Sequence, residues 1–91
     1  MSAAGFELIG RAGCGLCEEM GEALRAALGA HGSAPPLLER DVADDPERLR
    51  RFGRHLPVLL LHGAILCAHR LDGARLARAL AGERWEPLEL D

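Results

Sequence analysis

Two of the three cysteines in this chain, Cys14 and Cys17, are separated only by Gly15 and Leu16. The thiolate is the reactive form of cysteine both in disulfide exchange and in metal binding. A C-x-x-C spacing occurs in redox dithiols and in zinc sites, so the spacing alone does not choose between them. The pair is therefore a candidate reactive dithiol, part of a metal site, or an incidental pair in a cysteine-poor chain.

The residues around the pair predict a strand, a loop and a helix that would hold the two thiols. The apolar run over residues 6–10 is typical of a short buried strand, and a glycine-containing loop follows it. From residue 14 to about residue 29, apolar residues recur at helical spacing: Leu16, Met20, Ala23, Leu24, Ala27 and Leu28. Cys14 then lies where unpaired N–H groups favour an anion, and Cys17 lies one turn deeper.

This position predicts different roles for the two cysteines. A helix N-terminus lowers the pKa of a thiol, so we expect Cys14 to attack and Cys17 to resolve the mixed disulfide that forms. Glu18 and Glu19 oppose a thiolate, and the chain has no lysine, which leaves Arg11 as the nearest cation. We therefore expect the pKa of Cys14 to be lowered only moderately and to lie below that of Cys17.

The rest of the chain predicts a small α/β domain. Strands are expected over residues 37–42, 57–61 and 64–67, with helices over 46–53 and from Asp72 to about residue 82. The order β-α-β-α-β-β-α predicts a four-stranded mixed sheet with helices on both faces and an antiparallel hairpin at its edge. We expect one domain over residues 1–91, with its core in 6–82 and an acidic tail over 83–91 in which Trp85 packs against the domain.

Pro57 opens a strand whose apolar residues indicate a central place in the sheet. Proline there removes a ladder hydrogen bond. A cis Leu56–Pro57 bond would turn the backbone and expose the N–H and C=O of Leu56 to an extended substrate. A trans proline that merely starts the strand remains the alternative. His55, just before this segment, is either a loop residue or a proton shuttle.

The stretch C-G-L-C after the first strand, L-P-V at the third, and the element order together resemble the thioredoxin superfamily. The resemblance is strongest to small bacterial glutaredoxin-like proteins, in which GRAGCGLCEEM, RDVADDPERLRRFGRHLPVLLL and LDGARL recur in similar form. It covers about residues 6–82. It implies that Cys14 is the attacking thiol, Cys17 the resolving thiol and Pro57 a cis-proline beside them.

The resemblance also implies an activity, the reduction of protein or glutathione mixed disulfides. Gly-Leu stands where a typical dithiol glutaredoxin has Pro-Tyr, and Arg70 to Gly73 lack the glycine pair that helps to bind glutathione. Glutathione therefore stays open as a co-substrate, and no resident cofactor or metal is expected. The implied substrate contacts are Arg11, Gly15, Leu16, Leu56, Pro57, Val58 and Asp72.

Non-enzymatic functions remain as alternatives. In a metal-binding protein, Cys67 and His69 would complete a Cys3His ligand set with Cys14 and Cys17. In an iron–sulfur protein, a dimer would bridge a cluster through Cys14 and glutathione. In an adaptor protein, the dithiol would take no part in chemistry. Cys67 falls in the fourth predicted strand, away from the helix start, which favours a small buried apolar role for it.

Composition limits the partners. The net charge is −3 and acids surround the arginines, which argues against nucleic-acid binding. No apolar run is long enough to span a membrane, and no secretory signal is recognisable at the N-terminus. An odd, small number of cysteines favours a reducing compartment, so we expect a cytoplasmic monomer that acts on disulfide-bearing proteins or glutathione.

Overall fold

The computed structural model describes residues 5–90. Residues 1–4 and 91 of the predicted domain lie outside this range. The chain forms, in order, β1 (Phe6–Gly10), α1 (Gly15–His31), β2 (Leu37–Asp41), the short 3-10 helix η1 (Val42–Asp44), α2 (Pro46–Phe52), β3 (Val58–Leu61), β4 (Ala64–Ala68) and α3 (Gly73–Leu80). Apart from η1, this is the predicted order of strands and helices.

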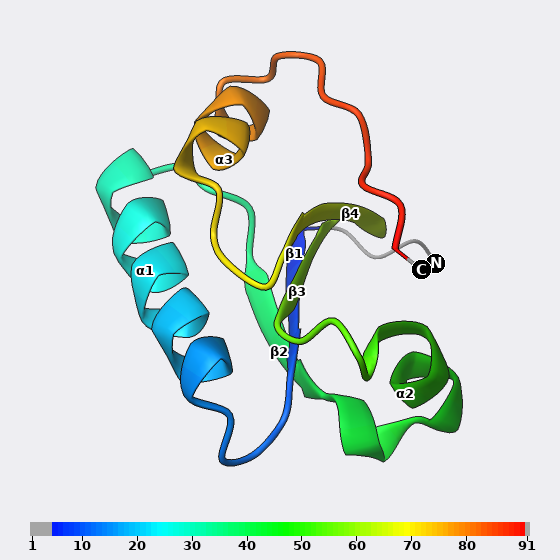
Figure 1. The fold of residues 1–91 in the computed structure, drawn as a ribbon. Coiled ribbons are helices and arrows are strands. Elements are labelled where there is room, and N and C mark those ends of the chain that lie inside the picture. The colour runs from blue at the N-terminus through cyan, green and yellow to red at the C-terminus, as the bar shows by residue number, and fades with distance from the viewer. Residues whose placement is uncertain (1–4, 91) are drawn as a thin grey trace.

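The four strands form one mixed sheet in the order β2-β1-β3-β4 (Figure 1). β1 runs parallel to β2 and antiparallel to β3, and β3 and β4 form an antiparallel hairpin, so β3 is central and β4 is an edge as predicted. Ile9 lies opposite Val58, and Val58 lies opposite Ala68. This register places three loops at one end of the sheet: the loop before α1, the segment before β3 and the loop after β4.

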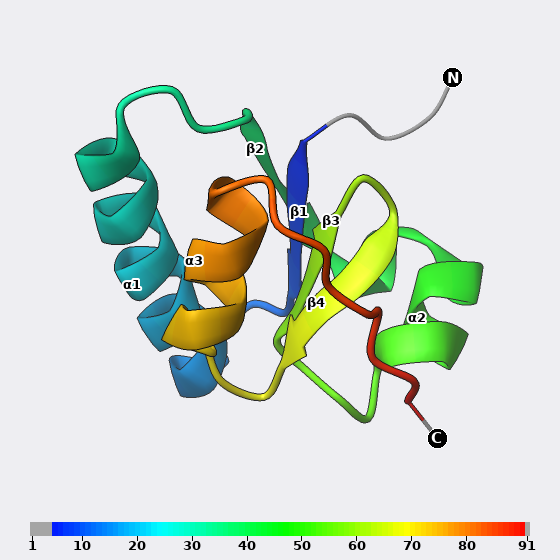
Figure 2. The same ribbon diagram turned by 90° about the horizontal axis from the view of Figure 1, so that it is seen from above.

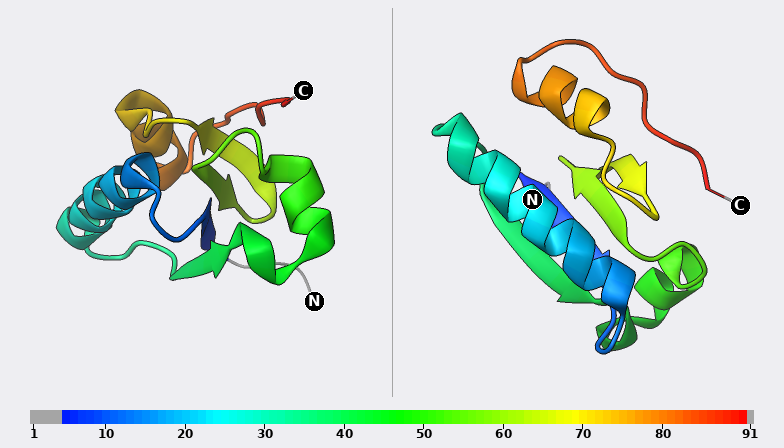
Figure 3. Two further views of the ribbon diagram at one scale, coloured as in Figure 1. Left: turned by 60° about the horizontal axis from the view of Figure 1, so that its bottom comes forward. Right: turned by 60° about the vertical axis from the view of Figure 1, so that its left-hand side comes forward.

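Helices cover both faces of the sheet, which confirms the predicted layers. Figure 3 shows α1 and α3 together on one side and α2 apart from them on the other. Alternate residues of β1 and β3 point to the two sides because side chains alternate along a strand. Phe6, Leu8, Leu59 and Leu61 pack under α1 and α3, whereas Ile9, Val58 and Leu60 pack with Phe52 of α2.

Several element boundaries differ from the predicted ones by one or two residues, and the ends of α1 and β2 show why. The first helix continues past Gly29 to His31 and ends at Gly32, whose φ of 86° suits the left-handed turn that glycine adopts readily. Gly29 lies on the exposed side of the helix, where nothing forces the chain to stop. The second strand ends at Asp41, because the Asp41 side chain accepts a hydrogen bond from the Ala43 N–H and begins η1.

The C-terminal tail runs back across β4 (Figure 2). The N–H of Leu88 donates to the carbonyl of Ile65 at 2.9 Å, so the tail covers part of the edge that β4 would otherwise expose. Trp85 packs against the core beneath α3, which confirms its predicted role, and Leu90 packs against the core on the α2 side. Within the described part of the chain, no helix is long and apolar enough to cross a membrane.

Candidate active site

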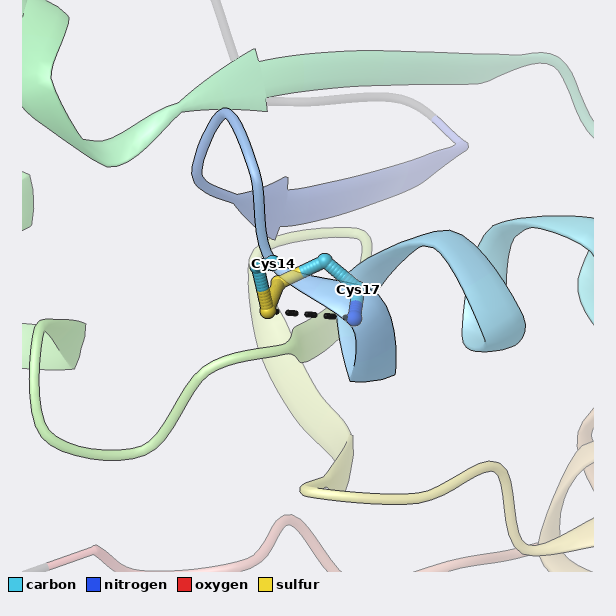
Figure 4. The surroundings of a disulfide bond; sticks show 2 residues. All are labelled: Cys14 and Cys17. Carbon is cyan, nitrogen blue, oxygen red and sulfur yellow. Dashed lines mark hydrogen bonds between the residues drawn. A yellow bond between two sulfur atoms is a disulfide. The ribbon is translucent and has the colours of Figure 1, made fainter.

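Cys14 is the N-cap of α1, as the sequence predicts. Its backbone is extended, with φ −95° and ψ 108°, and its carbonyl accepts the first helical hydrogen bond from Glu18 N–H at 3.1 Å. Its Sγ accepts from the N–H of Cys17 at 3.2 Å, the bond drawn in Figure 4. The sulfur therefore occupies the place of a capping oxygen, where the free N–H groups of the first turn favour a negative charge.

Cys14 and Cys17 are joined by a disulfide, with their Cα atoms 5.2 Å apart. That separation lies within the usual range for disulfides, so the pair closes without moving the helix. The two cysteines differ in access: Cys14 is half-buried, and Cys17 is only 8% exposed. Cys14 is therefore the more accessible of the two sulfur-bearing residues.

The buried stripe of α1 begins at Cys17 and continues through Met20, Gly21 and Leu24. Leu16, which the helical spacing placed in this stripe, is instead 53% exposed beside the disulfide. Its exposure is compatible with the substrate contact expected of it. Cys17 is buried because it shares the helical phase of Met20 and Leu24, which face the sheet.

Gly10 is a site residue that the sequence analysis missed. A Cβ added there would come within 3.2 Å of the Cys17 Cβ and 3.3 Å of its Sγ, so Cys17 packs directly on the end of β1. The sequence predicts Gly10 as the last residue of the first strand, where the loop begins, and the left-handed glycine of that loop is Gly13, with φ 75°. The sequence signal for this contact is a glycine that ends the strand just before the C-x-x-C pair.

The segment before β3 lies at the same end of the sheet. The Leu56–Pro57 bond is cis, and the carbonyl of Pro57 accepts a hydrogen bond from His69 N–H at 2.8 Å. The His55 and His69 rings meet edge to face with centroids 5.5 Å apart. The loop after β4 is thereby tied to the entry of β3.

Of the three backbone contacts expected at this segment, only Leu56 has a backbone open to a substrate. Val58 is completely buried and lies in the sheet between Ile9 and Ala68, and the Pro57 ring is also buried. Within residues 5–90, the Leu56 backbone makes no hydrogen bond. Pro57 and Val58 would thus act by shaping the Leu56 backbone.

The other expected substrate contacts, Arg11, Gly15 and Asp72, are all exposed. Arg11 lies in the loop before α1, and Gly15 begins the helix with open space where a side chain would project. Asp72 is the N-cap of α3, and its carboxylate accepts from Arg75 N–H at 3.1 Å. The register of the sheet brings the loop before α1, the segment before β3 and the start of the loop after β4 to the same end of the sheet. The Asp72 carboxylate already caps α3 through the Arg75 N–H.

Cys67 is a free, buried thiol in β4, which confirms its expected role as a small core residue. Burial raises its pKa, an effect opposed in part by the Asp72 N–H that donates to its sulfur at 3.4 Å. Within the described part of the chain, no three His, Cys, Asp or Glu side chains gather where they could hold a metal ion.

The family model described as Glutaredoxin-like domain (DUF836) matches residues 6–81. No curated protein gives a significant match. The matched range contains both cysteines of the disulfide, the cis-proline and the loop after β4, and it ends before the tail that covers β4.

Proposed function

Since this chain belongs to the glutaredoxin-like domain family, we propose that it is a thiol–disulfide oxidoreductase that reduces disulfides of proteins or of glutathione. Cys14 is the nucleophile and Cys17 the resolving cysteine. The cytoplasm is its proposed compartment, where glutathione and thioredoxin systems keep thiols reduced, and a monomer is its proposed active form.

One observation carries this proposal: the half-buried Sγ of Cys14 caps α1 and accepts the N–H of Cys17, its disulfide partner. A thiolate at that point is stabilised by the helix N-terminus without a neighbouring lysine. Cys17 is shielded against Gly10 and can reach Cys14 without backbone movement. The arrangement supports one accessible, half-buried thiol and one protected thiol, as a two-step exchange requires.

In the proposed cycle, the Cys14 thiolate attacks one sulfur of a substrate disulfide. A Cys14–substrate disulfide forms, and the other substrate sulfur leaves as a thiolate that takes a proton from water. Cys17 then loses its proton and attacks the Cys14 sulfur, which releases the second substrate thiolate and leaves the Cys14–Cys17 disulfide. The substrate has gained two electrons, and the Cys14–Cys17 dithiol has supplied them and become the disulfide.

Two glutathione molecules or a dithiol reductase would return the protein to the dithiol form. We propose the Leu56 backbone as the surface on which the peptide part of glutathione or of a protein substrate pairs, because its N–H and C=O are open at the end of the sheet. Arg11 would hold a substrate carboxylate, and Asp72 a substrate amine.

The test is a glutathione-coupled disulfide reduction assay of the full chain and three variants. Cys14→Ser is expected to abolish activity, and Cys17→Ser to stop protein-disulfide reduction while retaining any monothiol reaction with glutathione mixed disulfides. Cys67→Ser is the control, because that thiol is free, buried in the core and takes no part in the disulfide. Equal background rates in the wild type and Cys14→Ser would refute the proposed function.

A further inference from the structure

A groove of about 380 Å³ runs between α1 and the loop after β4. The helix contributes one wall and the loop the other; the lining residues are Leu16, Glu19, Met20, Ala23, His69, Arg70 and Leu71. The helical rise of about 1.5 Å per residue makes the stretch from Leu16 to Ala23 about 10 Å long, which equals about three extended residues. The groove has the length of a short peptide segment.

One end of the groove is formed by Leu16, the residue that directly precedes Cys17. Leu16 stands between the two cysteines of the disulfide and forms part of the groove with half of its surface exposed. The opposite wall is tied to the cis-proline segment, because His69 N–H donates to the Pro57 carbonyl. A polypeptide whose cysteine is bound to Cys14 would therefore enter the groove with the residues next to that cysteine.

The two walls carry opposite charges. Arg70 is exposed on the loop wall and has no ion-pair partner among residues 5–90, and Glu19 is exposed on the helix wall. Leu16, Met20 and Leu71 supply apolar surface between them. An acidic residue is attracted to the loop side and repelled from the helix side, which would orient a bound segment.

We propose that this groove binds the residues next to the reactive cysteine of a protein substrate and favours an acidic residue against Arg70. The proposal rests on the proposed disulfide reductase function and narrows its substrates to polypeptides with an acidic residue within about three positions of the cysteine. Arg70 contributes to specificity through charge, and the chemical step stays with Cys14 and Cys17.

The probe is a short synthetic peptide whose single cysteine is joined to thionitrobenzoate through a disulfide. Three versions of the peptide carry Asp, Asn or Lys two positions from the cysteine. The rate of thionitrobenzoate release gives kcat/KM for each peptide. At low salt the wild type should favour Asp over Asn by about threefold, the range of an exposed charge pair. The preference should lie in KM and should disappear at about 0.5 M salt.

Arg70→Glu should reverse the preference so that the Lys peptide reacts fastest. Arg84→Glu is the matched control, since it makes the same charge change on the exposed tail outside the groove. Glu19→Gln should increase the preference for Asp by about twofold. Glu18→Gln should not, because Glu18 lines a different cavity on the β2 side of the helix.

An unchanged Asp preference in Arg70→Glu, or an equal loss in Arg84→Glu, would overturn the proposal. It would also be overturned if Arg70→Glu slowed only the reduction of oxidised glutathione, since the groove would then hold glutathione and no protein segment. Reduction of an uncharged small disulfide by the wild type distinguishes a failure of the proposed reductase function from a failure of the proposed charge preference. If that activity is absent, the proposed function fails, whatever the charge preference.

Discussion

Arg75 holds the C-terminal tail to the domain, and its removal gives a sharp prediction. From α3, its Nε donates to the Leu66 carbonyl at 2.8 Å and its Nη2 to the Glu86 carbonyl at 2.5 Å. Its guanidinium also lies 6.0 Å from the centroid of the Trp85 ring. Arg75→Met would keep an apolar stem of similar length but lose both hydrogen bonds and the cation–π contact.

The expected loss follows from these contacts. A hydrogen bond to a charged group stabilises a fold by about 1.5–3 kcal/mol when buried, and less when solvent reaches it. Arg75 is half-buried and the Glu86 end is exposed, so we expect a total loss of about 2 kcal/mol in the free energy of unfolding. For a domain of this size that corresponds to a fall in Tm of about 10 °C.

Trp85 reports this change directly, because it is the only tryptophan and the chain has no tyrosine. Its emission should shift to the red in native Arg75→Met as the tail leaves β4, and urea unfolding should give the loss of stability. Arg78→Met is the control on the same helix: its contact with Glu83 is exposed and 3.9 Å long, so the loss should stay below about 0.5 kcal/mol. Equal losses in the two variants, or an unshifted emission in Arg75→Met, would refute this account of the tail.

Three further predictions concern the cysteines. Gly10→Ala should destabilise the oxidised protein by about 1–3 kcal/mol in urea unfolding, since the added Cβ presses on Cys17; an unchanged midpoint would contradict that packing. In the reduced protein, alkylation of Cys14 should begin at a lower pH than that of Cys17, and coincident pH profiles would contradict the helix-cap argument. Burial raises the pKa of Cys67, so as the pH rises the unfolded chain loses this proton before the folded protein does. The free energy of unfolding should therefore fall as the pH rises above about 8.5. In urea unfolding of the oxidised protein, Cys67→Ala should reduce this dependence of stability on pH.

The positions of the strands and helices could be predicted because local patterns specify them. The apolar run of β1, the helical spacing of α1 and the aspartate caps of α2 and α3 act within a few residues of where they appear. The same holds for the candidate nucleophile, whose place at the N-cap follows from the strand, loop and helix around it. These parts of the site are encoded in continuous stretches of sequence.

Features that depend on contacts between distant residues could not be predicted in this way. Gly10 matters because Cys17 packs on it, and Leu16 is exposed because the buried stripe of α1 starts one residue later. The tail has no hydrophobic periodicity, yet it covers β4 through one backbone hydrogen bond to Ile65 and the contacts of Arg75. The groove beside the disulfide likewise requires the loop after β4 to face α1.

The division of roles that we propose within C-G-L-C rests on helix geometry. Cys14 caps the helix with an extended backbone, so its sulfur lies outside the packed stripe, whereas Cys17 is already in helical phase with Met20 and Leu24 and is turned toward the sheet. Between them, Gly15 leaves open space and Leu16 points an apolar side chain into the groove. A residue with a bulky side chain at position 15 would crowd the approach to Cys14 without changing Cys17. The Gly-Leu pair therefore leaves room beside Cys14 for the polypeptide segment that the proposed groove would bind.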